Sequence, residues 1–339
     1  MSADFAMRRS AGEEENRLNP AAKLPELSVE ERRELEAQSR PNATLIHETI
    51  RAEGESELER TVSALLLSGF AAGLSMGFSL IMTGLLQSRL PDTAWRELVT
   101  HLGYTTGFLI VVLGRQQLFT ENTLTPILPL LYHRDLATLW RVLRLWGLVL
   151  AANVLATWAI ATALAHAPIF DGEVTTAYAE ISRHTMEHSF GITCIKAVFA
   201  GWLIALMVWL LPAADSARPL IIVIITYMVA LGGFTHIIAG SVDAFYLVAS
   251  GDATFADYTY RFFLPTLVGN VTGGVALVAV LNYGQVAPEL PRYCPVRPSL
   301  PRRSRKATSP SDARRISACS RAEKPVLPCS GGAVAAWCE

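Results

Sequence analysis

Charged residues are scarce in this 339-residue sequence. Lysine, arginine, aspartate and glutamate together make up 17% of it, whereas hydrophobic residues make up 51%. The mean hydropathy is +0.32, and the apolar residues gather in long runs. This composition excludes an ordinary soluble protein and indicates several membrane helices, each of which needs about 20 mostly apolar residues.

Cysteine is also scarce, and its spacing is typical of neither a zinc site nor a disulfide framework. The five cysteines form no CxxC pair, and they are Cys194, Cys294, Cys319, Cys329 and Cys338. The sequence also contains no HExxH, no GxSxG and no glycine-rich phosphate loop. We therefore expect no enzyme, no cofactor and no bound metal.

Six apolar segments are long enough to be membrane spans, and they are residues 61–87, 100–131, 140–165, 190–211, 219–248 and 261–283. The second and the fifth are interrupted by polar residues. Six such segments in one chain favour an all-α, six-span membrane bundle, here residues 61–285, over the buried helices of a soluble fold.

The charges in the tails and loops predict an orientation. The first 20 residues, MSADFAMRRSAGEEENRLNP, have no apolar core of the kind found in a signal peptide. We expect the N-terminus in the cytoplasm, and six spans would return the C-terminus to the same side. The short loops agree, because YHRDLATLWRVLR is basic whereas DGEVTTAYAEISRH and GDATFADY are acidic. The sequence thus predicts a multi-pass protein of the inner (cytoplasmic) membrane.

Two polar tails flank the predicted spans. Residues 1–60 are rich in acidic side chains, and residues 286–339 are rich in proline, serine and arginine. We expect the second tail to be disordered. Its PRRSRK stretch (301–306) is of a kind that contacts nucleic acid or anionic lipid. A cytoplasmic anchor is the simpler interpretation, so no nucleic-acid partner is expected.

The two interrupted spans carry similar polar breaks. The first is LGRQQLFTEN (113–122), and the second is LGGFTHIIAGS (231–241). Their Phe-Thr pairs place residues 119–121 opposite residues 234–236. Paired breaks in corresponding spans are the sequence sign of an inverted repeat, here of 3+3 helices with broken spans 2 and 5, around a central site.

A break at membrane depth needs polar partners, because unpaired backbone groups cost several kcal/mol in hydrocarbon. Such a break is stable where it is buried in protein or faces a water-filled path. We expect the two loops to meet near the membrane centre, where the helix ends would favour an anion. Asn153 and Asn270, each in an Asn-Val pair on the third span of its half, would pair with loop backbone groups. A plain hydrogen bond between helices is the alternative for each asparagine.

The polar residues of the loops allow further interpretations. Arg115 and Glu121 would form an ion pair that holds the first break, and Asn122 would support the same loop. Thr120 and Thr235 would present hydroxyls to a substrate or cap loop backbone. The histidines outside the breaks are expected to be solvated, and they are His47, His101, His133, His166, His184 and His188.

Four ordered motifs, LFTEN, GFTHIIAG, VGNVTGG and the ALMVW of span four, resemble the formate/nitrite transporter family. The stretch GRQQLFTENTLTP is most similar to its YfdC-like branch. The resemblance covers roughly residues 60–285. It implies an aquaporin-like protomer, a homopentamer with one pore in each protomer, and passage of small monovalent anions or their acids, such as formate or nitrite, across the lipid bilayer.

The resemblance also implies roles for individual residues. Thr120 would face the pore centre beside His236, the central pore histidine, and Lys196 would lie in the outer vestibule. Leu118 would form a constriction on the cytoplasmic side. Tyr104 and Val229 fall where some members carry constriction phenylalanines. The sequence departs from the family at Ala205, where members have a pore asparagine, and at Thr235, which is often glutamate.

Several interpretations remain open from the residues. His236 would carry a proton near neutral pH or pin its loop as a neutral ring, and Lys196 would attract anions or extend outward without a role. The favoured function is a channel or transporter for small monovalent anions or their conjugate weak acids, with passage coupled to protonation near His236. A pore for a neutral solute and a non-conducting membrane scaffold that signals through its tails are the alternatives.

Overall fold

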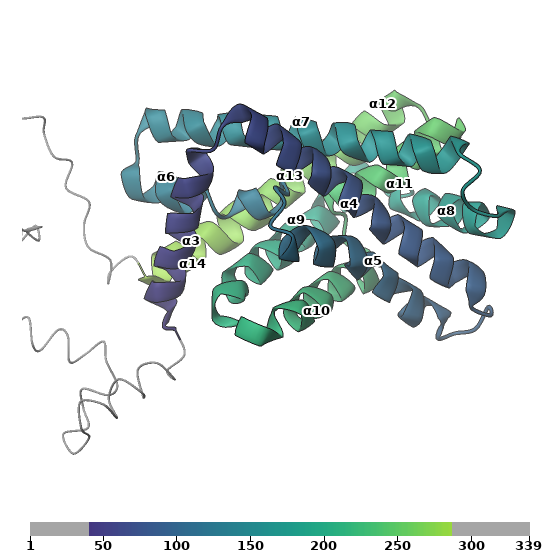
Figure 1. Ribbon diagram of the computed structural model, residues 1–339, viewed down its shortest axis with the longest axis horizontal. Coiled ribbons are helices and arrows are strands. Elements are labelled where there is room, and N and C mark those ends of the chain that lie inside the picture. Colours follow the sequence, from purple (N-terminus) through teal and green to yellow (C-terminus); the bar gives the residue numbers. More distant parts are fainter. Residues whose placement is uncertain (1–40, 287–339) are drawn as a thin grey trace, which may run out of the picture.

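The computed structural model describes residues 41–286, and this part of the chain is a bundle of helices (Figure 1). The α-helices are α3 (Ala43–Leu58), α4 (Val62–Arg89), α5 (Arg96–Leu113), α6 (Ile127–His133), α7 (Leu136–His166), α8 (Gly172–Thr185), α9 (Phe190–Leu210), α10 (Arg218–Leu231), α11 (Ile237–Ser250), α12 (Phe255–Asp257), α13 (Leu264–Thr272) and α14 (Leu281–Val286). Short 3-10 turns are η2 (Glu121–Thr123), η3 (Leu211–Ala213) and η4 (Asp215–Ala217), and π-helical segments are η5 (Tyr258–Phe263) and η6 (Gly273–Val280). The predicted basic tail and most of the acidic tail lie outside the described residues.

Within residues 41–286, four helices are long and apolar enough to cross a membrane. They are Val62–Arg89, Leu136–His166, Phe190–Ala213 and Phe255–Val286. These correspond to the first, third, fourth and sixth predicted spans. Their apolar side chains also face outward, and exposed leucine, isoleucine, phenylalanine and tryptophan side chains occur along all four. An outer surface of this kind is stable in contact with lipid or with another apolar surface.

The second and fifth predicted spans are each divided into two helices. The first stops at Leu113 and resumes at Ile127, and the second stops at Leu231 and resumes at Ile237. Each break begins with the chain in the left-handed conformation, at Arg115 (φ 48) and at Gly233 (φ 56). This conformation cannot continue a right-handed helix, so α5 ends before the Gly114-Arg115 pair and α10 before the Gly232-Gly233 pair.

Close contacts between helices hold both breaks in place. α4 packs on α5 and α7, and α9 packs on α13. A Cβ atom at Gly73 of α4 would lie 2.4 Å from the Asn153 carbonyl oxygen, and one at Gly201 of α9 would lie 2.2 Å from the Asn270 carbonyl oxygen. Glycine is therefore the residue that lets each helix approach the asparagine that contacts a break.

Helix α3 lies with α6 and α14 at one end of the bundle, and α8 and α12 lie at the other end (Figure 1). Against expectation, His47 of α3 is completely buried, with its ring beside Trp209 and Tyr283. Burial lowers the pKa of His47, although neighbouring Glu48 opposes this effect. The reason for the difference is that α3 packs on the bundle, so its inner face has little solvent.

Candidate functional site

The two breaks meet through a contact between their side chains. Thr120 Oγ1 of the first lies 2.7 Å from His236 Nε2 of the second. Thr120 is completely buried, and His236 is 1% exposed. The pair therefore joins two segments far apart in the sequence at a place that bulk water does not reach.

The histidine also caps helix α11, and this capping contact fixes which ring nitrogen carries the proton. Ala239 N donates to His236 Nδ1 at 3.1 Å. A backbone N–H can only donate, so Nδ1 must present its lone pair, and the neutral ring carries its proton on Nε2. Nε2–H then donates to Thr120 Oγ1. The Thr120 hydroxyl hydrogen remains available to an acceptor other than the ring.

Two buried asparagines hold the breaks with the same pattern of hydrogen bonds. Asn153 Oδ1 accepts from Phe119 N at 2.9 Å, and its Nδ2 donates to the Gln117 and Gly69 carbonyls at 3.0 and 2.7 Å. Both side chains are inaccessible to solvent, and neither carries a charge. Loop groups that would otherwise be unpaired inside the bundle are thus satisfied.

Asn270 repeats these contacts in the second half. Its Oδ1 accepts from Ile237 N at 2.8 Å, and its Nδ2 donates to the Thr235 and Ala197 carbonyls at 2.9 and 2.8 Å. Each asparagine therefore bonds to two loop residues and to one carbonyl of a neighbouring long helix. This arrangement differs from a hydrogen bond that joins two helices alone.

These hydrogen bonds correct the expected alignment of the two breaks. Gln117 takes the place of Thr235, and Phe119 takes the place of Ile237. Leu118 therefore corresponds to His236, three residues away from the alignment on the Phe-Thr pairs. The repeated dipeptide misled because it occurs in both breaks at different distances from the helix end.

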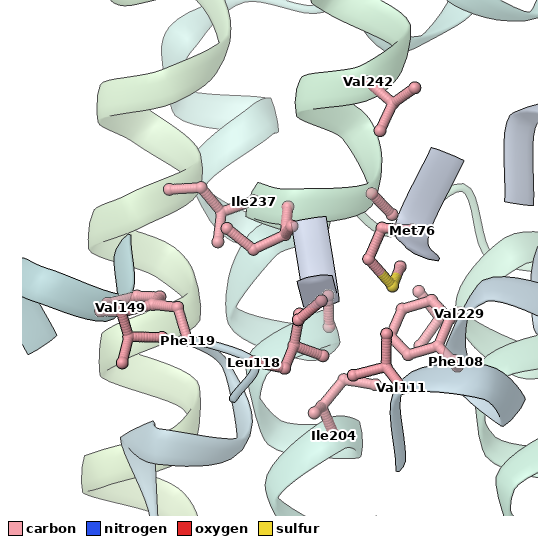
Figure 2. Packing of buried hydrophobic residues seen from close by; sticks show 14 of the residues in the cluster. Met76, Phe108, Val111, Leu118, Phe119, Val149, Ile204, Val229, Ile237 and Val242 are labelled. Atoms are coloured by element: carbon pink, nitrogen blue, oxygen red, sulfur yellow. The ribbon is translucent and has the colours of Figure 1, made fainter. Parts of the chain in front are cut away.

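Buried apolar side chains lie on the first break and on the helices that end at the two breaks. Leu118 and Val229 are fully buried, as are Phe108 and Val111 of α5. Figure 2 shows Leu118 pointing toward Val111 and Ile204, whereas Phe119 points toward Val149. The Phe108 ring meets the His236 ring edge-on at 4.9 Å between centroids, and the Tyr104 ring lies 5.3 Å from Phe108.

Phe108 was missed by sequence reasoning, although its spacing carries a signal. It follows Tyr104 by four residues and therefore lies on the same face of α5. The structure places Tyr104, Phe108 and Val111 along that face, and Val229 lies near Phe108 (Figure 2). The ring closest to His236 is thus supplied by α5 and not by the residues predicted as constrictions.

The expected ion pair between Arg115 and Glu121 is not formed. Arg115 is exposed, and its guanidinium lies 3.3 Å from Glu53 Oε1 of α3. Glu121 begins the turn η2, and its Oε1 is buried with no hydrogen-bond partner among the described residues. The left-handed backbone at Arg115 turns its side chain outward, which separates the two charges.

A polar network connects α3 to the first break on the side of Glu121. Glu57 accepts from Gln117 Nε2 at 3.1 Å and from Thr125 Oγ1 at 2.6 Å. Gln117 Oε1 in turn accepts from Asn122 Nδ2 at 2.8 Å. Burial raises the pKa of the Glu57 carboxyl, although these two donors act against the effect. No pattern in the sequence connects Glu57 with a loop 60 residues away.

Lys196 and Thr235 contact groups around the second break. Lys196 Nζ lies 2.5 Å from His188 Nε2, at the start of α9. A Cβ atom on Gly233 would be 3.3 Å from the same Nζ, so the ammonium group lies against the break. Thr235 Oγ1 donates to the Thr193 carbonyl at 2.9 Å, which is the backbone-capping role and not a free hydroxyl.

The family follows from comparison with known proteins. A model of the formate/nitrite transporter family matches residues 44–284. The chain belongs to the formate/nitrite transporter family. It is 44% identical over 244 residues to "Inner membrane protein YfdC" of Escherichia coli (strain K12), which covers 72% of this chain and 79% of that protein. This similarity places the chain in the YfdC-like branch of the family.

Other relatives are more distant. The "Formate channel BtFdhC" of Bacillus thuringiensis is 27% identical over 239 residues, covering 69% of this chain and 91% of that protein. Two solved structures share the fold at 18% and 16% identity, a "Pentameric formate channel with formate bound" and an "FNT family ion channel". Their TM-scores are 0.56 and 0.61; the matches cover 67% and 71% of this chain, and 98% and 99% of theirs. The chain is therefore a multi-pass membrane protein of a transporter family.

Proposed function

We propose that this formate/nitrite transporter family member is a channel for small monovalent anions or their conjugate weak acids, of which formate and nitrite are the first to test. Passage is coupled to protonation close to the Thr120–His236 pair. The observation that carries the proposal is the 2.7 Å contact between these two side chains, one from each break. The family and the formate channels among its relatives support the substrate class.

The proposed pathway runs past the two breaks in a six-span, aquaporin-like arrangement of 3+3 helices. The matched hydrogen bonds of Asn153 and Asn270 support this internal repeat. Leu118, Val229, Phe108 and Tyr104 form its apolar walls. An anion that loses its water between such walls pays a large desolvation free energy, whereas a neutral acid pays much less.

The central pair provides a directed hydrogen bond inside this apolar region. His236 Nε2–H occupies the Thr120 oxygen, so the Thr120 hydroxyl donates to a carboxylate or nitrite oxygen. The contact replaces part of the hydration that the substrate loses. Lys196, beside Gly233, attracts anions to the side of the bundle that carries α8.

The proposed assembly is a homopentamer in the inner membrane, with both termini in the cytoplasm. The exposed apolar side chains on the four long helices fit a lipid bilayer and neighbouring protomers. The pentameric formate channel that shares the fold and the inner membrane protein that is 44% identical support these two expectations.

The test is uptake by purified full-length protein in liposomes, with formate, nitrite, acetate and lactate offered at several pH values. We expect saturable uptake that rises as the pH falls, together with loss of uptake in T120V. A matched control is T157V, because Thr157 is a buried threonine of α7 whose hydroxyl donates to the Val154 carbonyl of the same helix. Water or glycerol flux without acid uptake would instead establish a neutral-solute pore, and no flux of any of these would establish a non-conducting protein.

A further inference from the structure

Glu121 is the one acidic residue of the first break, and it has no role in the pathway described so far. It follows Thr120 directly, so the two Cα atoms are about 3.8 Å apart. Its side chain is partly exposed, but its Oε1 is buried without a hydrogen-bond partner in the described part of the chain. No arginine, lysine or histidine there lies within ion-pair distance of its carboxyl group, and Arg115 pairs with Glu53 instead. A charged group placed in this way is costly, and groups kept at such places are usually functional.

The central histidine is poorly suited to carry a second proton. Its Nδ1 already accepts from Ala239 N, and its Nε2 already holds the proton of the neutral ring. Protonating Nδ1 would bring two N–H groups face to face and remove the cap of α11. The cost is about that of a helix cap, roughly 1 kcal/mol, together with the repulsion and the buried charge. His236 is therefore built to orient Thr120 and not to exchange protons.

Glu57 belongs to the polar network beside Glu121, because Gln117 donates to Glu57 and accepts from Asn122, the residue that follows Glu121. Glu57 accepts hydrogen bonds on both oxygens, from Gln117 and Thr125, which stabilise its ionised form. Glu121 has no such donor on Oε1. Two neighbouring carboxyl groups in a medium of low polarity share a proton, and the one with fewer donors retains it.

We propose that Glu121 is the proton-exchanging residue of the pathway, and that it passes its proton to a small carboxylate or nitrite held at Thr120. The O–H bond of the Glu121 carboxyl breaks and an O–H bond forms on the substrate anion. The products are the Glu121 carboxylate and the neutral acid. In the opposite direction the neutral acid returns the proton. This inference rests on the proposed function and specifies which group near His236 is titrated.

Other charged groups around Glu121 fit this assignment. From α3, Glu53 and Glu57 add negative charge, and Arg115 is held outward by Glu53. The guanidinium of Arg144 on α7 donates to the Arg60 carbonyl at 2.7 Å. His133 of α6 lies 3.3 Å from Glu55. Among the described residues, no positively charged side chain pairs with Glu121. Its negative charge is therefore removed by binding a proton.

The experiment uses full-length protein in liposomes and records labelled formate uptake and internal pH together. The variants are E121Q, E121D and E57Q. E59Q is the matched control, because it removes an exposed carboxylate at the end of the same helix, α3. H236N tests the histidine as the alternative proton donor, since asparagine still caps α11. Its uptake rate is expected to fall, because His236 orients Thr120, so only the pH profile of this variant is compared. Folding of each variant is checked by size-exclusion chromatography and thermal unfolding before reconstitution.

In the native protein, uptake falls by about tenfold for each unit of rising pH above the midpoint of its profile, and protons enter with formate. E121Q flattens this profile and separates formate from proton entry, whereas E121D and E59Q keep the slope. H236N keeps the slope at a lower rate of uptake. E57Q shifts the midpoint to lower pH, because Glu121 loses the neighbouring negative charge that holds its proton.

An unchanged slope and proton coupling in E121Q would overturn the assignment, as would an unchanged midpoint in E57Q if E121Q does not fold. A flat profile in H236N with a normal one in E121Q would assign the proton to the histidine. The proposed function is unaffected by any of these three results. If the native protein takes up none of the four acids, the proposed function fails, and the role of Glu121 fails with it.

Discussion

His236 Nε2 and Thr120 Oγ1 lie 2.7 Å apart although 116 positions separate them in the chain. The contact is possible because His236 caps α11 through its other ring nitrogen, which directs Nε2 at the opposite break. One side chain thus caps the start of a helix, joins the two breaks and orients the threonine hydroxyl. Changes at either residue should therefore affect transport more than stability.

The Thr120 hydroxyl should be needed for transport. T120V keeps the shape of the side chain and removes the donor, so uptake should fall by roughly tenfold or more, the equivalent of one lost hydrogen bond to an ionised group. T120S restores the hydroxyl and should keep most of the uptake. Initial rates of formate or nitrite entry into liposomes measure this difference. Equal rates in T120V and native protein would show that the hydroxyl does not contact the permeant species.

Either bracing asparagine should be essential for folding. N153L or N270L leaves two loop groups unpaired in the interior, at about 1–3 kcal/mol for each group. Each variant also removes the second hydrogen bond of one helix carbonyl. Thermal unfolding of purified protein in detergent should show a large loss of stability in both variants. Because the two contact sets match, the losses should be similar. A loss confined to N153L would indicate that the second loop is held by other contacts.

Gly73 and Gly201 should not tolerate alanine, because a Cβ atom at either site meets backbone of the neighbouring helix. Gly147 on α7 provides the matched control, since a Cβ there has nothing within 4 Å. G73A and G201A should be destabilised by about 1–3 kcal/mol, as expected for overpacking. G147A should gain up to about 1 kcal/mol of helix propensity. The same unfolding measurement compares all three, and a stable G73A would contradict the described packing of α4 on α7.

Substitutions at Arg115 and at Gly233, where α5 and α10 end, should change the stability of the protein in opposite directions. Both residues have positive φ, which costs a residue with a Cβ atom about 1 kcal/mol. R115G should therefore stabilise the protein slightly, because its exposed ion pair with Glu53 contributes little. G233A should destabilise it. Melting temperatures of the two variants test this, and a destabilised R115G would show that the Arg115–Glu53 contact matters more than the backbone strain.

His47 should make stability depend on pH. Its pKa is lowered from 6.5 in the folded protein, so at lower pH the unfolded chain takes up a proton that the folded chain does not. Stability should therefore be unaffected above about this pH and should decline as the pH falls below 6.5. H47F keeps a buried ring that cannot take up a proton, so the loss of stability at low pH should be smaller in this variant. Unfolding of both proteins across this range is the measurement, and identical pH profiles would rule out His47 as the cause.

Much of the architecture can be predicted from the local pattern of the sequence. Runs of apolar residues near 20 long define α4, α7, α9 and the last helical stretch, because the thickness of a bilayer fixes that length. The two breaks are visible for the same reason, since polar groups inside such runs must have partners. Thr120, His236 and both asparagines stand out as the polar residues of otherwise apolar segments.

The register of the breaks and the partners of their charges could not be predicted in this way. The hydrogen bonds of the two asparagines place Leu118 in the position of His236, and they depend on where the loop atoms lie in space. The repeated Phe-Thr pair does not indicate these positions. Arg115 pairs with Glu53, and Gln117 donates to Glu57, because α3 packs against the first loop. Hydrophobicity and helix length are properties of neighbouring residues and can be read along the chain. The charge environment of a buried group is set by segments that meet only after the bundle has packed.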